Sequence, residues 1–279
     1  MKPGKIKKQE FELFRYYLKK NVGITLHPSK IGHFGRKLKK RLELLGFKSY
    51  TAYFRFIKGK EGEQERRNLI NMTTIGQTSF FRGDQQFDYL CESILQELIK
   101  NNSKKRRLRI WSAGCSMGQE PYTVAMLIHD NARIMLTWDV KILATDIDSE
   151  ALVIAKKGIY GEKLTKEVKA GYIQKYFIQK RVKGEMQYII KNNLKKRLVF
   201  RRFNLLDFPY PMKGFFDIIL CRNVMIYFDK EDKKKILGEF FKLLDPNGVL
   251  LLGGSESLLG LDDRFKLEGH AVYRKRIIL

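Results

Sequence analysis

The chain has 279 residues, 44% of them hydrophobic, and a formal net charge of +25, so it can bury one large core or a small core beside a larger one. It has no run of the ~20 apolar residues that span a bilayer, and its N-terminal segment is too charged for a secretory signal, so we expect a cytoplasmic protein without membrane insertion. Three cysteines, Cys91, Cys115 and Cys221, lie far apart with no histidine at ligand spacing, which predicts reduced thiols and no metal site.

The positive charge is concentrated near the start of the chain. Residues 1–70 hold 19 Lys and Arg against 6 Asp and Glu, a net charge of +13. So basic a segment favours contact with nucleic acid, an acidic membrane or an acidic protein surface, and composition alone does not choose among these. It indicates a basic module attached to a second unit.

Amphipathic helical patterns occupy four segments of this module, residues 5–20, 29–46, 50–58 and 63–74. The second pattern has one apolar stripe, formed by Ile31, Phe34, Leu38, Leu42 and Leu45. Lysine and arginine cover its other faces. We therefore predict an all-helical domain over residues 1–72, followed by a linker over 73–90.

From Arg107 onward the pattern changes to strands that alternate with helices. Strands are predicted over residues 108–111, 140–145, 216–220, 249–252 and 271–278. Helices are predicted over 119–133 and from Ser149. Such alternation is typical of a parallel α/β sheet, whose ligands bind at the carboxyl ends of the strands. We predict this second domain over residues 91–279.

Residues 158–200 interrupt the alternation with a helical stretch and two short β segments, 186–190 and 198–203. We interpret the region 158–203 as an inserted antiparallel β subdomain. The basic runs 101–107 and 191–197 are expected to be solvated turns.

A turn of small residues from Ser112 to Gly118 follows the first strand and opens a helix, so a ligand could approach its backbone closely. Asp146, at the end of the next strand, could accept hydrogen bonds from ribose hydroxyls, whereas Asp148 or Ser149 suits the cap of the following helix. Dinucleotide folds place the acidic ribose ligand about 20 residues beyond the glycines. Asp146 lies 32 residues beyond Gly114, which disfavours NAD.

Five segments resemble, in order and at compatible spacing, the signature blocks of the CheR methyltransferases: 73–82 (TTIGQTSFFR), 112–122 (SAGCSMGQEPY), 144–148 (ATDID), 204–206 (NLL) and 221–228 (CRNVMIYF). The resemblance covers nearly the whole chain. It implies a Rossmann-like class I sheet that binds S-adenosylmethionine without a metal. It also implies methylation of glutamate side chains on the cytoplasmic domains of chemotaxis receptors.

The resemblance further implies which residues bind the cofactor: Gly76, Thr78, Arg82, Gly114, Glu120, Asp146, Asn204, Leu205, Asn223 and Val224. Arg82 and Tyr227 would be catalytic, beside the transferred methyl group. Two positions depart from the family pattern, since Gly76 replaces a frequent Asn and Gln119 replaces the usual Glu. The first change removes a hydrogen bond to the cofactor.

The basic helical domain is expected to dock acidic receptor segments through Arg36, Lys37, Lys40 and Arg41, although a solvated basic face is about as common. A monomer is expected, with no specific nucleic-acid partner. In some members of the family the inserted β subdomain also binds a receptor peptide, and the edge near 186–190 could do so by strand addition.

Two other functions stay open. A basic S-adenosylmethionine enzyme could methylate RNA or DNA, but residues 221–224 (CRNV) stand where such enzymes carry an Asn/Asp-Pro-Pro-Tyr motif. A non-catalytic protein could bind the cofactor for signalling only. Arg82, Asn223 and Tyr227 argue against that reading, and Gly76 leaves room for it.

Overall fold

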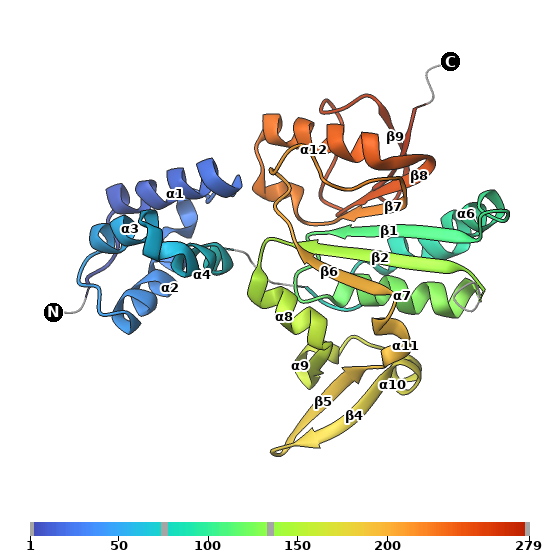
Figure 1. Ribbon diagram of the computed structural model, residues 1–279, viewed down its shortest axis with the longest axis horizontal. Helices are drawn as coiled ribbons and strands as arrows, with labels where there is room; N and C mark the ends of the chain where they lie inside the picture. The colour runs from blue at the N-terminus through green and yellow to red at the C-terminus, as the bar shows by residue number, and fades with distance from the viewer. Residues whose placement is uncertain (1–2, 74–77, 133–136, 277–279) are drawn as a thin grey trace.

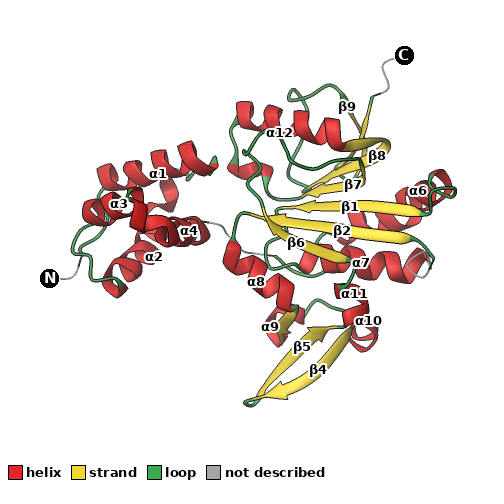
Figure 2. Cartoon of the chain, in the orientation of Figure 1, coloured by secondary structure: helices red, strands yellow, loops and turns green. Residues whose placement is uncertain are grey.

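The computed structural model describes residues 3–73, 78–132 and 137–276. A bundle of helices lies at one end, a large sheet with flanking helices forms the middle, and a small sheet projects from one side (Figure 1). Figure 2 shows that the bundle is helical throughout, whereas the rest of the chain mixes helices with strands. None of the described helices is long and apolar enough to cross a bilayer.

The N-terminal bundle contains α1 Lys8–Val22, η1 Pro28–Lys30, α2 Ile31–Leu44, α3 Tyr50–Lys58, η2 Lys60–Gly62 and α4 Glu63–Thr73. Its core consists of side chains that recur at helical spacing, among them Phe14, Leu18, Leu38 and Leu42, all 0% exposed. The four predicted helices are confirmed. Helix α1 begins later than predicted, because the Glu10 carboxylate accepts a hydrogen bond from the Lys7 backbone and caps the helix there.

In the described residues, the main sheet has seven strands in the order β6-β2-β1-β7-β8-β10-β9. They are β1 Arg107–Ala113, β2 Asp139–Asp146, β6 Leu198–Arg202, β7 Phe216–Cys221, β8 Leu244–Leu252, β9 Phe265–Gly269 and β10 Val272–Lys275. The first five in that order are parallel, and β10 and β9 complete the edge in antiparallel pairing. The predicted α/β class is confirmed, although β9 was not predicted.

Helices cover both faces of this sheet, and the strands between them are therefore apolar on both sides. The flanking helices are α5 Asp84–Tyr89, α6 Leu95–Asn101, α7 Gln119–Ala132, α8 Ser149–Lys157 and α12 Lys230–Leu243, with a π turn at Leu90–Ile94 between α5 and α6. Ile110 of β1 packs on one face with residues of α6 and α7, and Trp111 packs on the other with Phe240 of α12. The helical stretch from Asp84 to Asn101 was not predicted, and it occupies part of the expected linker.

The insertion is smaller than predicted. It contains β3 Ile159–Gly161, α9 Glu162–Thr165, α10 Ala170–Tyr176, β4 Phe177–Val182 and β5 Glu185–Ile190, and its three strands pair antiparallel in the order β3-β5-β4. The prediction that residues 198–203 belong to it is wrong. Strand β6 pairs in parallel with β2, from Ile142 opposite Leu198 to Asp146 opposite Arg202, and so forms an edge of the main sheet.

The basic run 191–197 is also not the solvated turn that we expected. It contains the short helix α11 Asn192–Lys195, which buries Leu194. The ammonium groups of Lys191 and Lys195 donate to backbone carbonyls of neighbouring segments, at Gln174, Lys175 and Lys157. This run therefore connects the insertion to the sheet.

The helical bundle contacts the sheet domain just beyond the carboxyl ends of the strands. The backbone N–H of Thr25 donates to the carbonyl of Tyr227 at 3.0 Å. Lys19 of α1 forms ion pairs with Asp229 and Asp232 at the start of α12. Gly23 ends α1 at φ +73°, and a Cβ there would lie 2.0 Å from Leu206 Cδ1, so the two domains approach closely at this point.

Candidate active site

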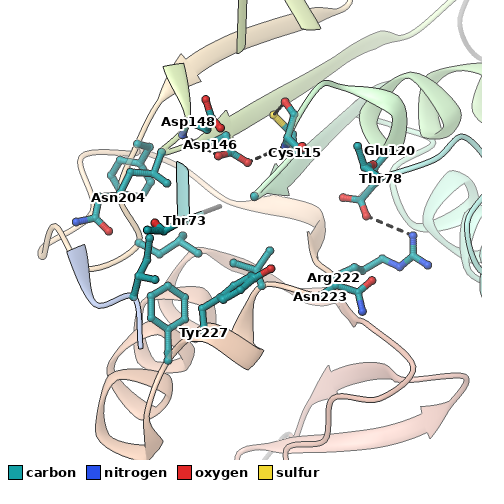
Figure 3. Close-up of a pocket in the computed structure, with 18 of the residues that line it drawn as sticks. Thr73, Thr78, Cys115, Glu120, Asp146, Asp148, Asn204, Arg222, Asn223 and Tyr227 are labelled. Atoms are coloured by element: carbon teal, nitrogen blue, oxygen red, sulfur yellow. Dashed lines mark hydrogen bonds and ion pairs between the residues drawn. The ribbon is translucent and has the colours of Figure 1, made fainter. Parts of the chain in front are cut away.

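A cavity of about 1070 Å³, counted with its opening to solvent, lies at the carboxyl edge of β1, β2 and β7 (Figure 3). The helical bundle contributes Val22 and Ile24 to its wall. The cavity brings together ten predicted site residues: Thr78, Arg82, Gly114, Glu120, Asp146, Asn204, Leu205, Asn223, Val224 and Tyr227. Gly76 lies outside the described residues. The sequence blocks thus converge on one cavity, while the roles of their side chains remain predictions.

The turn between β1 and α7 forms one wall of the cavity. The N–H groups of Gly114 and Cys115 donate to the carbonyl of Thr145 at 2.8 and 2.9 Å, which fixes the turn against the end of β2. Gly114 has φ +87°, and a Cβ there would lie 2.3 Å from Val224 Cγ2. Both constraints require glycine, and the result is bare backbone beside the cavity.

Asp146 is held at the end of β2 by two backbone donors. Its carboxylate accepts hydrogen bonds from the N–H of Ser116 at 2.7 Å and of Asp148 at 2.8 Å. Burial raises the pKa of Asp146 to about 6. An ionised carboxylate has further acceptor positions, so Asp146 can accept hydrogen bonds from a hydroxylated ligand. Asp148 caps α8 through the N–H of Glu150 and Ala151, as predicted.

Glu120, in the first turn of α7, is a second carboxylate on the cavity wall. It accepts a hydrogen bond from the Ser112 hydroxyl at 2.7 Å and pairs with Arg222, whose Nη1 lies 3.3 Å from Glu120 Oε2. Burial raises the pKa of Glu120, and the nearby guanidinium opposes this rise. Its ionised form would attract an ammonium group of a ligand.

The turn after β7 forms the opposite wall and carries Asn223 at φ +60°. Its conformation is fixed by Glu256, whose carboxylate accepts from the Asn223 N–H at 2.8 Å and from the Gly253 N–H at 2.7 Å. The sequence reasoning assigned no role to Arg222 or Glu256. Arg222 lies inside the block 221–228, and Glu256 follows the buried strand β8 at the carboxyl edge of the sheet, so their positions in the sequence could have indicated both residues.

Cys115, which lies in the cavity wall, and Cys221 are buried free thiols, and burial raises the pKa of both well above its ordinary value. Neutral, buried thiols pack as small apolar side chains and are poor nucleophiles. Among the described residues, no group of three or more His, Cys, Asp or Glu side chains is arranged to hold a metal ion.

Two family models together match most of the chain. The model described as "CheR methyltransferase, SAM binding domain" matches residues 76–274, and "CheR methyltransferase, all-alpha domain" matches residues 9–74. The chain belongs to the CheR methyltransferase family. The resemblance inferred from the sequence blocks is thereby confirmed.

CheR relatives match along nearly their full length. "Chemotaxis protein methyltransferase 1" of Pseudomonas aeruginosa is 38% identical over 266 residues, covering 92% of this chain and 93% of the relative. "Chemotaxis protein methyltransferase" of Borreliella burgdorferi is 36% identical over 247 residues, covering 86% and 85%. A solved putative S-adenosyl-L-methionine-dependent methyltransferase from Methanococcus maripaludis has 14% identity and a TM-score of 0.33 over 64% of this chain and 66% of its own, too low to carry an argument.

The side chains that line the cavity of this CheR protein suit the polar groups and the flat ring of S-adenosylmethionine. Glu120 presents an acid suited to the amino group of the cofactor, and Asp146 presents acceptors suited to ribose hydroxyls. The turn glycine gives close access to backbone, and Leu205, Val224 and Phe228 add apolar surface for a flat ring.

The four basic residues predicted to dock a partner differ in their surroundings. Arg36 and Lys40 on α2 are exposed. Lys37 donates to the carbonyl of Met72 at 3.0 Å, and Arg41 pairs with the buried Glu65, with Nε 2.9 Å from Oε2. Lys37 and Arg41 therefore hold α2 against α4, which leaves Arg36 and Lys40 as the better candidates for docking.

Proposed function

We propose that this protein transfers the methyl group of S-adenosylmethionine to glutamate side chains of chemotaxis receptors, as a protein-glutamate O-methyltransferase in chemotactic adaptation. One observation carries the proposal: Glu120, Asp146, Asn223 and Tyr227, from three separate sequence blocks, line a single cavity at the carboxyl edge of the sheet. The chemotaxis methyltransferase names of the relatives support the choice of acceptor.

In this proposal different cavity residues bind different parts of the cofactor. Glu120 binds its amino group, Asp146 binds the ribose hydroxyls, and the adenosine lies against Asn204, Leu205, Asn223 and Val224. Gly114 gives the ligand access to backbone, and Thr78 and Arg82 contact it from the segment between the domains. Gly76, in that same segment, has no side chain to offer a hydrogen bond.

The acceptor needs no general base. A glutamate side chain has an unperturbed pKa of about 4.3, so at neutral pH it is already an anion with a nucleophilic oxygen. The bound cofactor supplies the electrophile, a sulfonium methyl group. The protein must therefore orient the incoming carboxylate, which we assign to Arg82 and Tyr227, at roughly 3–3.5 Å from the carbon it attacks.

Exclusion of water should add to this positioning. The reaction joins an anion to a cation and leaves neutral products, so strong solvation of the reactants slows it. The apolar side chains of Leu205, Val224 and Phe228 line the same cavity as Tyr227. Arg82 has to steer the acceptor without pairing so tightly that its oxygen loses nucleophilicity.

The partner in this proposal is the acidic cytoplasmic domain of a methyl-accepting receptor. The helical domain, residues 1–72, would dock there through exposed cations such as Arg36 and Lys40, and the enzyme would act as a monomer in the cytoplasm. The expectation of strand addition at the edge near 186–190 is wrong, because β5 lies between β3 and β4 and pairs with both. A receptor peptide that adds a strand to the insertion would have to pair with the outer edge of β4 instead.

A labelling assay tests the reaction class. The protein is incubated with S-adenosylmethionine that carries a labelled methyl group, together with receptor cytoplasmic domain, RNA or buffer, and the product is then treated with mild base. Glutamyl methyl esters should form on the receptor and release their label, whereas N-methyl groups would retain it. Label on RNA, or base-stable label on the receptor, would exclude the proposal. An Arg82→Ala variant that binds cofactor and turns over normally would exclude the orienting role.

A further inference from the structure

Glu256 lies behind the cavity wall and makes three hydrogen bonds to its backbone. The residue is 8% exposed and is not among the described residues that line the cavity. Its Oε2 accepts from the N–H of Asn223 at 2.8 Å and of Gly253 at 2.7 Å, and its Oε1 accepts from the N–H of Ile226 at 3.3 Å. One carboxylate thus contacts both ends of the segment from Asn223 to Ile226.

This segment is conformationally demanding. Asn223 has φ +60°, a left-handed conformation that asparagine adopts more readily than other side chains but that its surroundings still have to select. Gly253 leaves no room for adjustment, because a Cβ there would lie 2.7 Å from Asn223 Nδ2 and 2.8 Å from Glu256 Oε2. The carboxylate and the glycine backbone together hold Asn223 in this conformation.

The same segment carries two of the residues that face the cavity. Asn223 and Tyr227 rise from the same wall in Figure 3, and both line the cavity. Tyr227 directly follows Ile226, whose N–H is the third donor to Glu256. A shift of the Glu256 carboxylate would therefore move both the proposed adenosine contact and the proposed catalytic tyrosine.

We propose that Glu256 is a positioning residue that sets Asn223 for cofactor binding through Oε2 and Tyr227 for methyl transfer through Oε1. The inference rests on the proposed function, since both consequences are effects on that reaction. Glu256 would touch neither the cofactor nor the acceptor.

The two oxygens allow the two effects to be separated. A glutamine keeps one carbonyl oxygen, which should face the Asn223 and Gly253 donors because two hydrogen bonds are gained there. Its NH₂ group would then face the N–H of Ile226, where two donors repel each other. Glu256→Gln should thus loosen Tyr227 while Asn223 stays fixed, and Glu256→Ala should release both.

Asp217 provides a matched control at the other end of β7. Its carboxylate is also buried, at 7% exposure, and accepts hydrogen bonds from the Arg109 N–H and the Asn102 amide, both at 2.7 Å. Because it lies at the amino end of the strand, Asp217→Asn should lower thermal stability without changing cofactor affinity or turnover of the folded protein.

The experiment measures the Kd of S-adenosylhomocysteine by calorimetry, and kcat with receptor cytoplasmic domain, at a temperature where all variants are folded. Glu256→Gln should keep Kd within about threefold and lower kcat about tenfold. Glu256→Ala should raise Kd at least about tenfold as well. Wild-type values for Kd and kcat in folded Glu256→Ala, or losses in Asp217→Asn that equal those of Glu256→Ala, would overturn the positioning role. Failure of the wild-type protein to bind S-adenosylhomocysteine would instead defeat the proposed function itself.

Discussion

Arg222 and Glu120 form a buried ion pair on the cavity wall, with Arg222 Nη1 3.3 Å from Glu120 Oε2 and side chains that are 7% and 14% exposed. The same guanidinium donates to the carbonyl of Arg82 and lies over the ring of Phe87 at 4.7 Å. Figure 3 shows Arg222 reaching toward Glu120. One cation therefore connects the acid proposed to bind the cofactor amino group with the segment that carries Arg82.

Replacing Arg222 should impair cofactor binding through Glu120. In Arg222→Ala the buried carboxyl loses the cation that opposes the rise of its pKa, so more of it is protonated at neutral pH. The protonated acid attracts the cofactor ammonium weakly. We expect a Kd for S-adenosylhomocysteine at least about tenfold higher at pH 7, recovering in part as pH rises.

Calorimetry from pH 7 to pH 9 checks this expectation. Arg264→Ala is a suitable control, because Arg264 pairs with Asp262 in a loop of the sheet domain and neither residue lines the cavity. If Arg222→Ala bound S-adenosylhomocysteine with wild-type affinity at every pH tested, Arg222 would not act on cofactor binding through Glu120.

Asp146 should give cofactor binding a pH dependence near pH 6. Burial raises the pKa of Asp146 to about 6, above the value of about 3.9 in an unfolded chain. The folded state thus holds the proton more tightly, so ionisation of Asp146 lowers the stability of the ligand-free protein as pH rises from about 4 to about 6. The proposed ribose contact needs the ionised form, so affinity should rise over the same range.

The affinity for S-adenosylhomocysteine should fall by up to about tenfold per pH unit below pH 6 in the wild-type protein. Asp146→Asn should bind more weakly and lack this step. Asp139→Asn, at the exposed start of the same strand, should keep it. An unchanged pH profile in Asp146→Asn would show that another group titrates.

Gly114 and Val224 should be coupled across the cavity edge. Gly114→Ala places a Cβ 2.3 Å from Val224 Cγ2 at a residue with φ +87°, and the backbone strain alone costs about 1–3 kcal/mol. Adding Val224→Ala removes the clash and leaves the strain. Urea unfolding should show that the double variant is more stable than Gly114→Ala, with a coupling of at least about 1 kcal/mol. Gly254→Ala, with nothing within 4 Å of its Cβ, should have little effect. If the changes in unfolding free energy of the two single variants simply added in the double variant, Gly114 and Val224 would not be in close contact.

The spacing of apolar residues predicted where the helices and strands lie better than it predicted which strands pair with one another. The helices of the bundle and the central strands bury regular apolar stripes or runs, which are visible in sequence. Strand β6 was misassigned because only the short basic run 191–197 separates it from 186–190, a spacing that suits an antiparallel hairpin, whereas it pairs in parallel with the distant β2. Two neighbouring β segments are easily taken for a hairpin, because a parallel partner such as β2 lies far away in the sequence.

For the site residues too, the sequence did not reveal contacts between side chains that lie far apart along the chain. The sequence blocks predicted which residues converge, because four of the five lie where a strand of the main sheet ends. The fifth, 73–82, is the segment between the two domains. Arg41 was taken for a docking residue because a helical pattern places it on a polar face, and nothing local reveals that Glu65 of α4 pairs with it. Glu256 meets Asn223 across 33 positions, a contact fixed by the order of strands β7 and β8.

The junction of the two domains should affect the cofactor site. Lys19 pairs with Asp229 and Asp232, and the chain just beyond it supplies Val22 and Ile24 to the cavity wall. In Lys19→Glu three acidic groups repel one another, which should loosen that wall and raise the Kd of S-adenosylhomocysteine about threefold to tenfold. Stability should change by only about 1 kcal/mol, because these pairs are partly exposed. Lys20→Glu makes the same charge change one residue on, away from these acids, and equal effects of the two variants would contradict a role for the junction.

Docking to a receptor should depend on Arg36 and Lys40, which are exposed on α2. Reversing both to Glu should weaken receptor methylation, most strongly at low ionic strength, where the Debye length is about 30 Å. The Kd of S-adenosylhomocysteine and the melting temperature should stay unchanged, because neither residue lines the cavity.

Arg41→Ala should behave differently, because it leaves Glu65, whose side chain is 8% exposed, without its ion pair. Loss of one partner of a buried pair costs about 3 kcal/mol, so Arg41→Ala should lower the melting temperature and affect methylation only through unfolding. Parallel melting curves and methylation assays at two salt concentrations distinguish the cases. If Arg36→Glu/Lys40→Glu methylated the receptor like the wild type at both concentrations, α2 would not be the docking surface, and the high positive charge of the bundle would need another explanation.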